Sequence, residues 1–193
     1  MDPVAILIPG LAYSAERPLL HFAGAVFASR GWQIRPVSWS EPPPRRAGRY
    51  FAEWFTEQRS FVRTQLTPIL DSVTASRVAL AGKSMGAFAA ALAAERELPA
   101  VWLTPVLNDS PLVDDLRAAT APFLLVGSDA DPAWDAAAAR GFGQPVCEVL
   151  GADHSLEFAG DPVRSVAALR TVTVAIDAFV RDLPGIGQGV ARG

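Results

Sequence analysis

The segment Gly82-Lys83-Ser84-Met85-Gly86 places a serine between two glycines, and two kinds of site contain such a segment. One is the end of a phosphate-binding P-loop, and the other is the G-x-S-x-G turn that exposes a nucleophilic serine. A P-loop needs another glycine five positions before Gly82, where this chain has Arg77. The four residues between them, VALA, are typical of a strand and not of a loop that wraps a phosphate. The sequence therefore argues against a P-loop.

The flanking residues favour a nucleophilic serine. SRVALA before the turn reads as a strand, and AFAAALAAERE after it reads as a helix. The turn between them is strained, so a side chain at position 82 or 86 would collide with its neighbours, which explains both glycines. We expect Ser84 at the carboxyl end of a strand, above a helix N-terminus. Lys83 is interpreted equally well as a solvent-facing residue.

A serine hydroxyl needs a base that takes its proton, and the chain has two histidines. His21 lies within an expected helix, in LLHFAGAVF, and is interpreted as a partly buried structural residue. His154 lies in GADHSLEF, on a loop after the last expected strand. That loop is at the same end of the sheet as Ser84, so we favour His154 as the base.

The base in turn needs a carboxylate that fixes its tautomer and stabilises the imidazolium. The segment SDADP follows the preceding expected strand and offers Asp129 and Asp131, although either could instead cap the next helix. We favour Asp131, because it lies further from the strand and is held by Pro132, and keep Asp129 as the alternative acid. The predicted triad is then Ser84, Asp131 and His154 in chain order.

The elements that must position these residues alternate along the chain. Short apolar runs predict strands over residues 4–8, 34–39, 77–81, 100–103, 123–127 and 146–150. Amphipathic or alanine-rich runs predict helices over residues 15–29, 50–72, 85–96, 111–119, 133–140 and 162–183. This alternation predicts an α/β fold of three layers, with about six mostly parallel strands and helices on both faces. We expect one domain over residues 1–183 and a flexible tail over residues 184–193.

Composition narrows the function classes. The chain has 193 residues and a formal net charge of -3, which gives no case for binding nucleic acid or an anionic membrane. No apolar run is long enough to span a bilayer, and the N-terminus lacks the pattern of a secretory signal. The single cysteine, Cys147, fits a reducing compartment, so we expect a cytoplasmic protein. No cluster with metal-ligand spacing occurs, so we expect neither a metal nor another cofactor.

Three motifs, GKSMG at 82–86, GSDADP at 127–132 and ADHSLE at 152–157, resemble those of the α/β-hydrolases. The chain looks like the small, lidless kind, similar to dienelactone-hydrolase-like esterases with serine in place of their cysteine. The resemblance spans nearly the whole chain. It implies a minimal α/β-hydrolase fold with strand order 2-1-3-4-5-6, in which the loops after strands 1 and 3 flank the ligand crevice.

The resemblance also implies where an oxyanion would be held. Such families commonly carry His-Gly after the first strand, whereas this chain has Pro9 and Gly10. Proline removes one backbone donor, so the hole is assigned to the N–H groups of Met85 and Leu11.

We therefore expect a serine hydrolase, a carboxylesterase acting on small-molecule apolar esters. The alternative is a catalytically silent α/β-hydrolase-fold protein that serves in binding or as a scaffold. The pocket could be lined by residues on loops or strand ends at the active edge, although ordinary packing explains them as well. These residues are Leu11, Tyr13, Trp39, Trp134 and Leu156.

Overall fold

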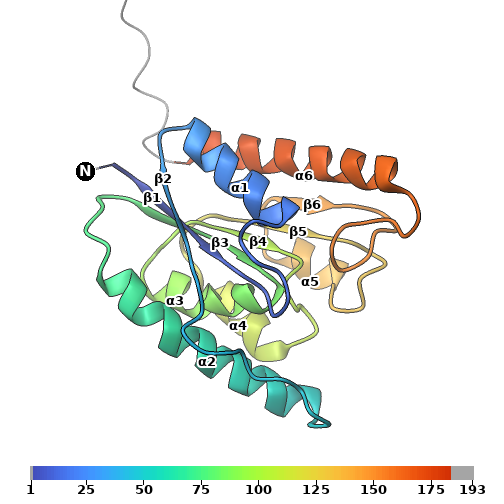
Figure 1. Ribbon diagram of the computed structural model, residues 1–193, viewed down its shortest axis with the longest axis horizontal. Coiled ribbons are helices and arrows are strands. Elements are labelled where there is room, and N and C mark those ends of the chain that lie inside the picture. The colour runs from blue at the N-terminus through green and yellow to red at the C-terminus, as the bar shows by residue number, and fades with distance from the viewer. Residues whose placement is uncertain (1, 184–193) are drawn as a thin grey trace, which may run out of the picture.

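A six-stranded sheet runs through the computed structural model, which describes residues 2–183 (Figure 1). Every neighbouring pair of strands is parallel, and the order is β2-β1-β3-β4-β5-β6. The strands are β1 (Val4–Ile8), β2 (Gln33–Pro36), β3 (Val78–Lys83), β4 (Ala100–Leu103), β5 (Phe123–Gly127) and β6 (Val146–Glu148). The predicted order and the predicted parallel sheet are thus confirmed.

Helices connect the strands and cover both faces of the sheet. They are α1 (Pro18–Ser29), α2 (Phe51–Asp71), α3 (Ala90–Glu95), α4 (Ser110–Ala118), α5 (Ala136–Gly141) and α6 (Pro162–Asp182). A 3-10 segment, η1 (Ser84–Ala89), comes directly after β3 and leads into α3. The predicted tail over residues 184–193 lies outside the described residues.

Aspartates cap the N-termini of three of these helices. The side chains of Asp109, Asp135 and Asp161 accept hydrogen bonds from the backbone N–H groups three residues on, at 3.3, 2.9 and 2.9 Å. Each cap satisfies a backbone donor that has no partner within the helix. The cap at Asp135 explains why α5 begins three residues later than the composition of the segment predicts.

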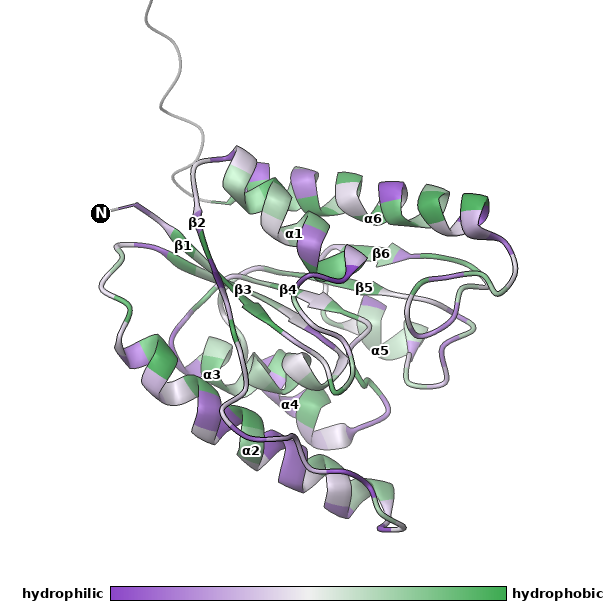
Figure 2. Cartoon of the chain, in the orientation of Figure 1, coloured by the Kyte–Doolittle hydropathy of each residue, from purple (hydrophilic) through white to green (hydrophobic). Residues whose placement is uncertain are grey.

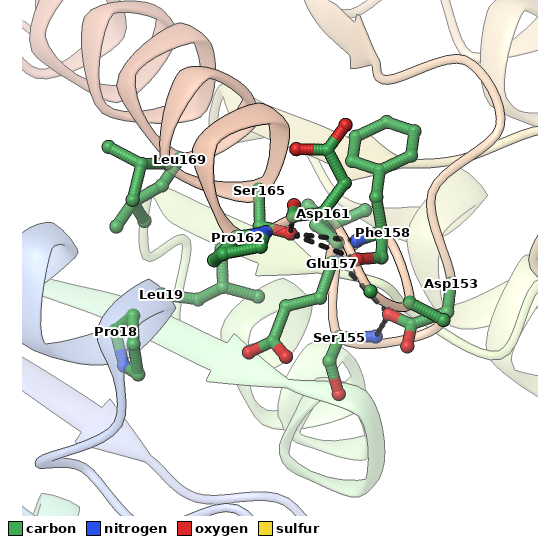
Figure 3. A pocket seen from close by; sticks show the side chains of 14 residues that line it. Pro18, Leu19, Asp153, Ser155, Glu157, Phe158, Asp161, Pro162, Ser165 and Leu169 are labelled. Carbon is green, nitrogen blue, oxygen red and sulfur yellow. Dashed lines mark hydrogen bonds between the residues drawn. The ribbon is translucent and has the colours of Figure 1, made fainter.

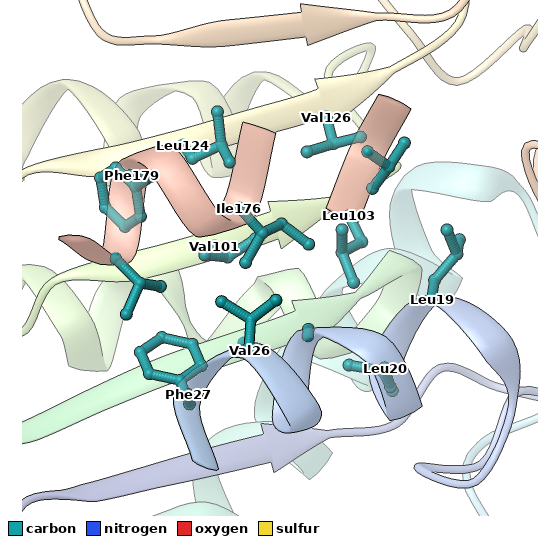
Figure 4. Packing of buried hydrophobic residues seen from close by; sticks show 14 of the residues in the cluster. Leu19, Leu20, Val26, Phe27, Val101, Leu103, Leu124, Val126, Ile176 and Phe179 are labelled. Carbon is teal, nitrogen blue, oxygen red and sulfur yellow. The ribbon is translucent and has the colours of Figure 1, made fainter. Parts of the chain in front are cut away.

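Side chains alternate between the two faces of the sheet and form two hydrophobic clusters. One cluster packs α1 and α6 against residues such as Val101, Leu103 and Val126 (Figure 4). The other packs α2, η1, α3, α4 and α5 against residues such as Ile8 and Trp102. Green and purple segments alternate along α2 and α6 in Figure 2, as expected for helices with one apolar face.

Parallel pairing brings the carboxyl ends of all six strands to one edge of the sheet. The register aligns Ile8 of β1 with Gly82 of β3, so the loop after β1 lies beside the turn that contains Ser84. The order reverses between β1 and β3, which makes this edge the place where open parallel sheets bind ligands.

Candidate active site

Ser84 lies at a strained turn between β3 and η1. Its φ angle is +52°, in the left-handed region that a residue with a side chain rarely adopts. A Cβ atom at Gly82 would lie 2.6 Å from the carbonyl oxygen of Gly86, and one at Gly86 would lie 2.4 Å from that of Ile8. The turn is therefore too tight for any side chain at either position, as the sequence predicts.

Ser84, His154 and Asp131 form one continuous chain of hydrogen bonds. The Oγ atom of Ser84 lies 2.8 Å from Nε2 of His154, and Nδ1 of His154 lies 2.7 Å from Oδ2 of Asp131. With its proton on Nδ1, the imidazole donates to the carboxylate and accepts from the hydroxyl. This is the arrangement in which a histidine can take a proton from a serine.

The side chains of this hydrogen-bonded triad differ in their exposure to solvent. The Asp131 side chain is only 1% exposed, whereas that of His154 is 39% exposed. Asp131 is also fixed by its second oxygen, Oδ1, which accepts a hydrogen bond from the N–H of Ala133 at 3.0 Å. A small molecule can therefore reach the imidazole, while the carboxylate that orients it stays shielded from water.

The alternative acid, Asp129, has a different partner. Its Oδ1 accepts a hydrogen bond from the N–H of Gly151 at 2.6 Å, so it links the loops after β5 and β6. Ser128, which is fully buried, links the same two loops by donating to the carbonyl oxygen of Ala152 at 2.7 Å. Of the two carboxylates, only Asp131 contacts the imidazole.

Asp153 shapes the loop that carries His154. Its Oδ1 accepts hydrogen bonds from the N–H groups of Ser155 at 2.8 Å and Glu157 at 3.0 Å. An aspartate that accepts hydrogen bonds from the next backbone N–H groups in this way stabilises the local turn. An aspartate two residues before a serine is the signal in the sequence that indicates such a turn.

Lys83 is buried, which corrects its interpretation as a solvent-facing residue. It is 2% exposed, and its Nζ donates to the backbone carbonyl oxygen of His154 at 2.8 Å. Burial lowers its pKa from 10.5 to about 8, although the nearby carboxylates of Asp131 and Asp153 favour the charged form.

His21 is exposed on α1, not partly buried as its position among apolar residues suggested. Its ring packs edge-on against that of Phe22, with the centroids 5.2 Å apart. Of the two histidines, His154 is the one that contacts Ser84.

The two predicted oxyanion donors belong to the two turns that the sheet brings together. Met85 is the second residue of η1, directly after Ser84, and its side chain is buried. Leu11 lies in the tight turn after β1, which is closed by a hydrogen bond of 2.9 Å from the N–H of Gly10 to the carbonyl oxygen of Tyr13. The assignment of their N–H groups to an oxyanion stays a prediction.

The residues predicted to line a pocket are found mainly in the core. Tyr13, Trp134 and Leu156 are at most 9% exposed, and Trp39 is half-buried against Phe61. Trp134 packs directly on Gly127, where a Cβ atom would lie 2.1 Å from its ring.

A cavity of about 430 Å³ lies beside the loop that carries His154 (Figure 3). Leu156 lines it, together with Asp153 and Ser155 from the same loop, and Pro18 and Leu19 from the start of α1 on the other side. The cavity thus adjoins the triad loop, although neither Ser84 nor His154 lines it.

Within residues 2–183, no group of three or more His, Cys, Asp or Glu side chains is arranged to hold a metal ion. Over the same range, no helix combines the length and the apolar character that crossing a bilayer requires.

Known structures resemble this fold closely in shape and weakly in sequence. Est1E from Butyrivibrio proteoclasticus matches with a TM-score of 0.63 and 15% identity, over 92% of this chain and 86% of that one. A serine hydrolase without a lid from Xanthomonas campestris matches with a TM-score of 0.57 and 17% identity, over 95% and 83%. A dienelactone hydrolase from Anabaena variabilis matches with a TM-score of 0.59 and 17% identity, over 94% and 87%.

No protein-family model and no curated protein matches the sequence. The structural likenesses show that the chain has an α/β-hydrolase fold, as its three motifs predict.

Proposed function

We propose that the protein is a serine hydrolase, a carboxylesterase that cleaves small apolar esters with Ser84, His154 and Asp131. One observation carries the proposal: the three side chains form a hydrogen-bonded chain whose nucleophile stands on a strained turn at the carboxyl edge of the sheet. Packing alone would not require a hydroxyl, an imidazole and a buried carboxylate to be hydrogen-bonded in this order.

The reaction follows from the positions of the protons. His154 Nε2 takes the proton of Ser84 as Oγ bonds to the ester carbonyl carbon, and the carbonyl oxygen becomes an oxyanion. When the carbon–oxygen bond of the alcohol breaks, Nε2 gives its proton to the leaving alcohol. Water then repeats the attack on the acyl-enzyme, which releases the acid and restores Ser84. The carboxylate of Asp131 stabilises the imidazolium.

The oxyanion would be held by the N–H groups of Met85 and Leu11. These residues follow β3 and β1, which are adjacent in the sheet, so both turns can face one carbonyl oxygen. Pro9 has no N–H to offer, which leaves the turn after it as the source of the second donor.

A small-molecule ester is the substrate that we infer. Among the structural neighbours are a protein named as a dienelactone hydrolase and Est1E, which has also been solved with ferulic acid bound. The half-exposed imidazole leaves room for a small ester at the edge of the sheet. We propose a cytoplasmic protein because the half-buried Cys147 is a free thiol.

Intact-protein mass spectrometry after treatment with a fluorophosphonate tests the proposal. One adduct on the wild-type chain and none on Ser84→Ala would support an activated serine. A panel of short-chain esters, with and without competing alcohols, would then separate hydrolysis from acyl transfer. A folded wild-type chain without any adduct would contradict the proposal and favour the silent scaffold.

A further inference from the structure

Lys83 is the only lysine in the chain, which otherwise uses arginine at all of its sixteen strongly basic positions. It is also a basic side chain that the fold removes from water almost completely, since 2% of the residue is exposed. A buried ammonium group is costly unless it has partners. Because it is buried, Lys83 does not contribute to solubility, and its position directly before Ser84 needs another explanation.

The partners of Lys83 come from three loops at the carboxyl edge of the sheet. Its Nζ donates to the carbonyl oxygen of His154 at 2.8 Å, and it stands 5.2 Å from the centre of the Tyr13 ring. The carboxylates of Asp131 and Asp153 attract the ammonium group, and the guanidinium group of Arg17 at the start of α1 repels it.

The contact with His154 links distant parts of the sheet. The loop that carries His154 follows β6, a strand of three residues that pairs with β5 at the end of the strand order. Lys83 belongs to β3, and both β4 and β5 lie between β3 and β6. The hydrogen bond from Nζ thus ties the loop of the base directly to the strand that ends at the nucleophile.

We propose that Lys83 is a positioning residue for His154, whose ammonium group holds the main chain of the histidine loop at the distance that Ser84 requires. The inference rests on the proposed function, because it concerns the same reaction. Misplacing a catalytic group by about 1 Å can slow a reaction about a hundredfold, so an anchor at this point has a large effect on rate.

The low pKa of Lys83, about 8, adds a dependence on pH to this anchor. Below that pH the ammonium group makes a charge-assisted hydrogen bond to the carbonyl oxygen, which is about twice as strong as a neutral one. Above it the amine is neutral and the anchor weakens. Tyr13, the other titratable group in contact with Lys83, has a pKa raised above 10 by burial and stays neutral in this range.

The rate of fluorophosphonate labelling at Ser84, measured between about pH 6 and pH 9.5, tests the inference. We expect the wild-type rate to fall as pH rises through about 8. The substitution Lys83→Met keeps an unbranched side chain, one atom shorter, and removes its charge and its donors. We expect Ser84 of this variant to be labelled about 10- to 100-fold more slowly at pH 7 than in wild type, and its labelling rate not to fall above pH 8. In an ester assay the loss should appear in kcat more than in KM.

Arg63→Met is the matched control for the loss of one positive charge. The Arg63 side chain is 51% exposed and pairs with Glu95 on the surface, so we expect its labelling rate to stay within about twofold of wild type. If Lys83→Met does not fold, the decline of the wild-type rate above pH 8 still tests the anchor.

The single lysine also allows a direct measurement that needs no catalysis. In protein made with ¹³C-labelled lysine, the ε-carbon gives one signal, whose titration should have its midpoint near pH 8. A midpoint above pH 10 would overturn the proposed pH dependence.

The outcomes separate this inference from the proposed function. A wild-type chain that no fluorophosphonate labels would contradict the serine hydrolase itself. Wild-type and Lys83→Met chains that label at equal rates and with parallel pH profiles would leave the hydrolase intact and overturn the role of Lys83.

Discussion

At the residue scale, hydrogen bonding distinguishes two carboxylates that lie only two positions apart. Asp131 reaches His154 at 2.7 Å, while Asp129 binds the N–H of Gly151. The sequence places both at the correct end of the sheet but does not show which one turns toward the imidazole. That choice depends on the turn after β5, in which the N–H of Asp131 bonds to the carbonyl oxygen of Ser128 at 3.1 Å.

We predict that Asp131→Asn slows labelling of Ser84 by about 10³- to 10⁴-fold, because an amide cannot stabilise the imidazolium and favours the wrong tautomer. Asp129→Asn keeps an acceptor for the N–H of Gly151 and should slow labelling less than about tenfold. Single-turnover labelling rates of both variants measure the difference. Equal losses would show that the acid has been assigned wrongly.

Lys83 also makes the stability of the chain depend on pH. Its pKa is about 8 in the folded chain and 10.5 for an ordinary lysine, so between these values the unfolded chain binds more protons. The free energy of unfolding therefore rises with pH in this window, as the cost of burying a charge is relieved. Below pH 8, Lys83 is charged in the folded chain as well, so the full cost of burying the ammonium group lowers the free energy of unfolding.

Between about pH 7 and pH 10, we predict that wild type gains roughly 2 kcal/mol of stability relative to Lys83→Met, which lacks the amine. Urea unfolding of both proteins at the two pH values measures this change. Groups that do not interact with Lys83 titrate alike in the two proteins and cancel in the comparison. A constant difference between the two proteins would mean that the amine is not desolvated.

At the element scale, the sequence predicts three of the strands to the residue and other elements less closely. Residues 4–8, 100–103 and 123–127 form strands with the predicted bounds, because short apolar runs between turn residues have few alternatives. β2 ends at Pro36 and not at residue 39, although the N–H of Val37 still bonds to the carbonyl oxygen of Leu7 at 2.8 Å.

The helix predicted over residues 85–96 shows what local pattern cannot reveal. It begins as the 3-10 segment η1, because the turn at Ser84 brings Gly86 against the backbone of Ile8. That approach depends on the pairing of β1 with β3, which are about 70 residues apart in the chain. Local pattern does not reveal the burial of Lys83 for the same reason, since its partners His154 and Tyr13 come from loops far away in sequence.

Gly86→Ala should destabilise the protein by about 1–3 kcal/mol or more, because the new Cβ atom would lie 2.4 Å from a backbone oxygen that cannot easily move. Gly141→Ala is the control, since nothing lies within 4 Å of a Cβ atom at that end of α5. It should be neutral or stabilise by up to about 1 kcal/mol. Denaturant unfolding of both variants measures their free energies of unfolding. Equal values would contradict the steric clash expected at position 86.

At the scale of the whole molecule, one sheet separates two hydrophobic clusters that share its strands. Each cluster contains a buried tryptophan, Trp32 on the side of α1 and α6 and Trp102 on the side of α2 to α5. Because alternate residues of β1, β3, β4 and β5 belong to the two clusters, neither can lose its packing without disturbing the strands of the other. This coupling is the basis for proposing one domain over residues 1–183.

We predict that Ile176→Ala in one cluster and Leu66→Ala in the other each cost about 2–5 kcal/mol, because both side chains are fully buried. Each variant should still unfold in a single transition, with tryptophan fluorescence and circular dichroism giving the same midpoint. Separate midpoints would divide the chain into two units and contradict the single domain.

The uniqueness of Lys83 has a consequence for proteolysis. A protease that cuts only after lysine has one target in this chain, the peptide bond between Lys83 and Ser84, which the fold keeps at the centre of the sheet edge. Cleavage there requires β3 to leave the sheet, so its rate follows the population of open molecules. Each cut yields two fragments and destroys the turn at Ser84, so the appearance of fragments measures how often the catalytic edge comes apart.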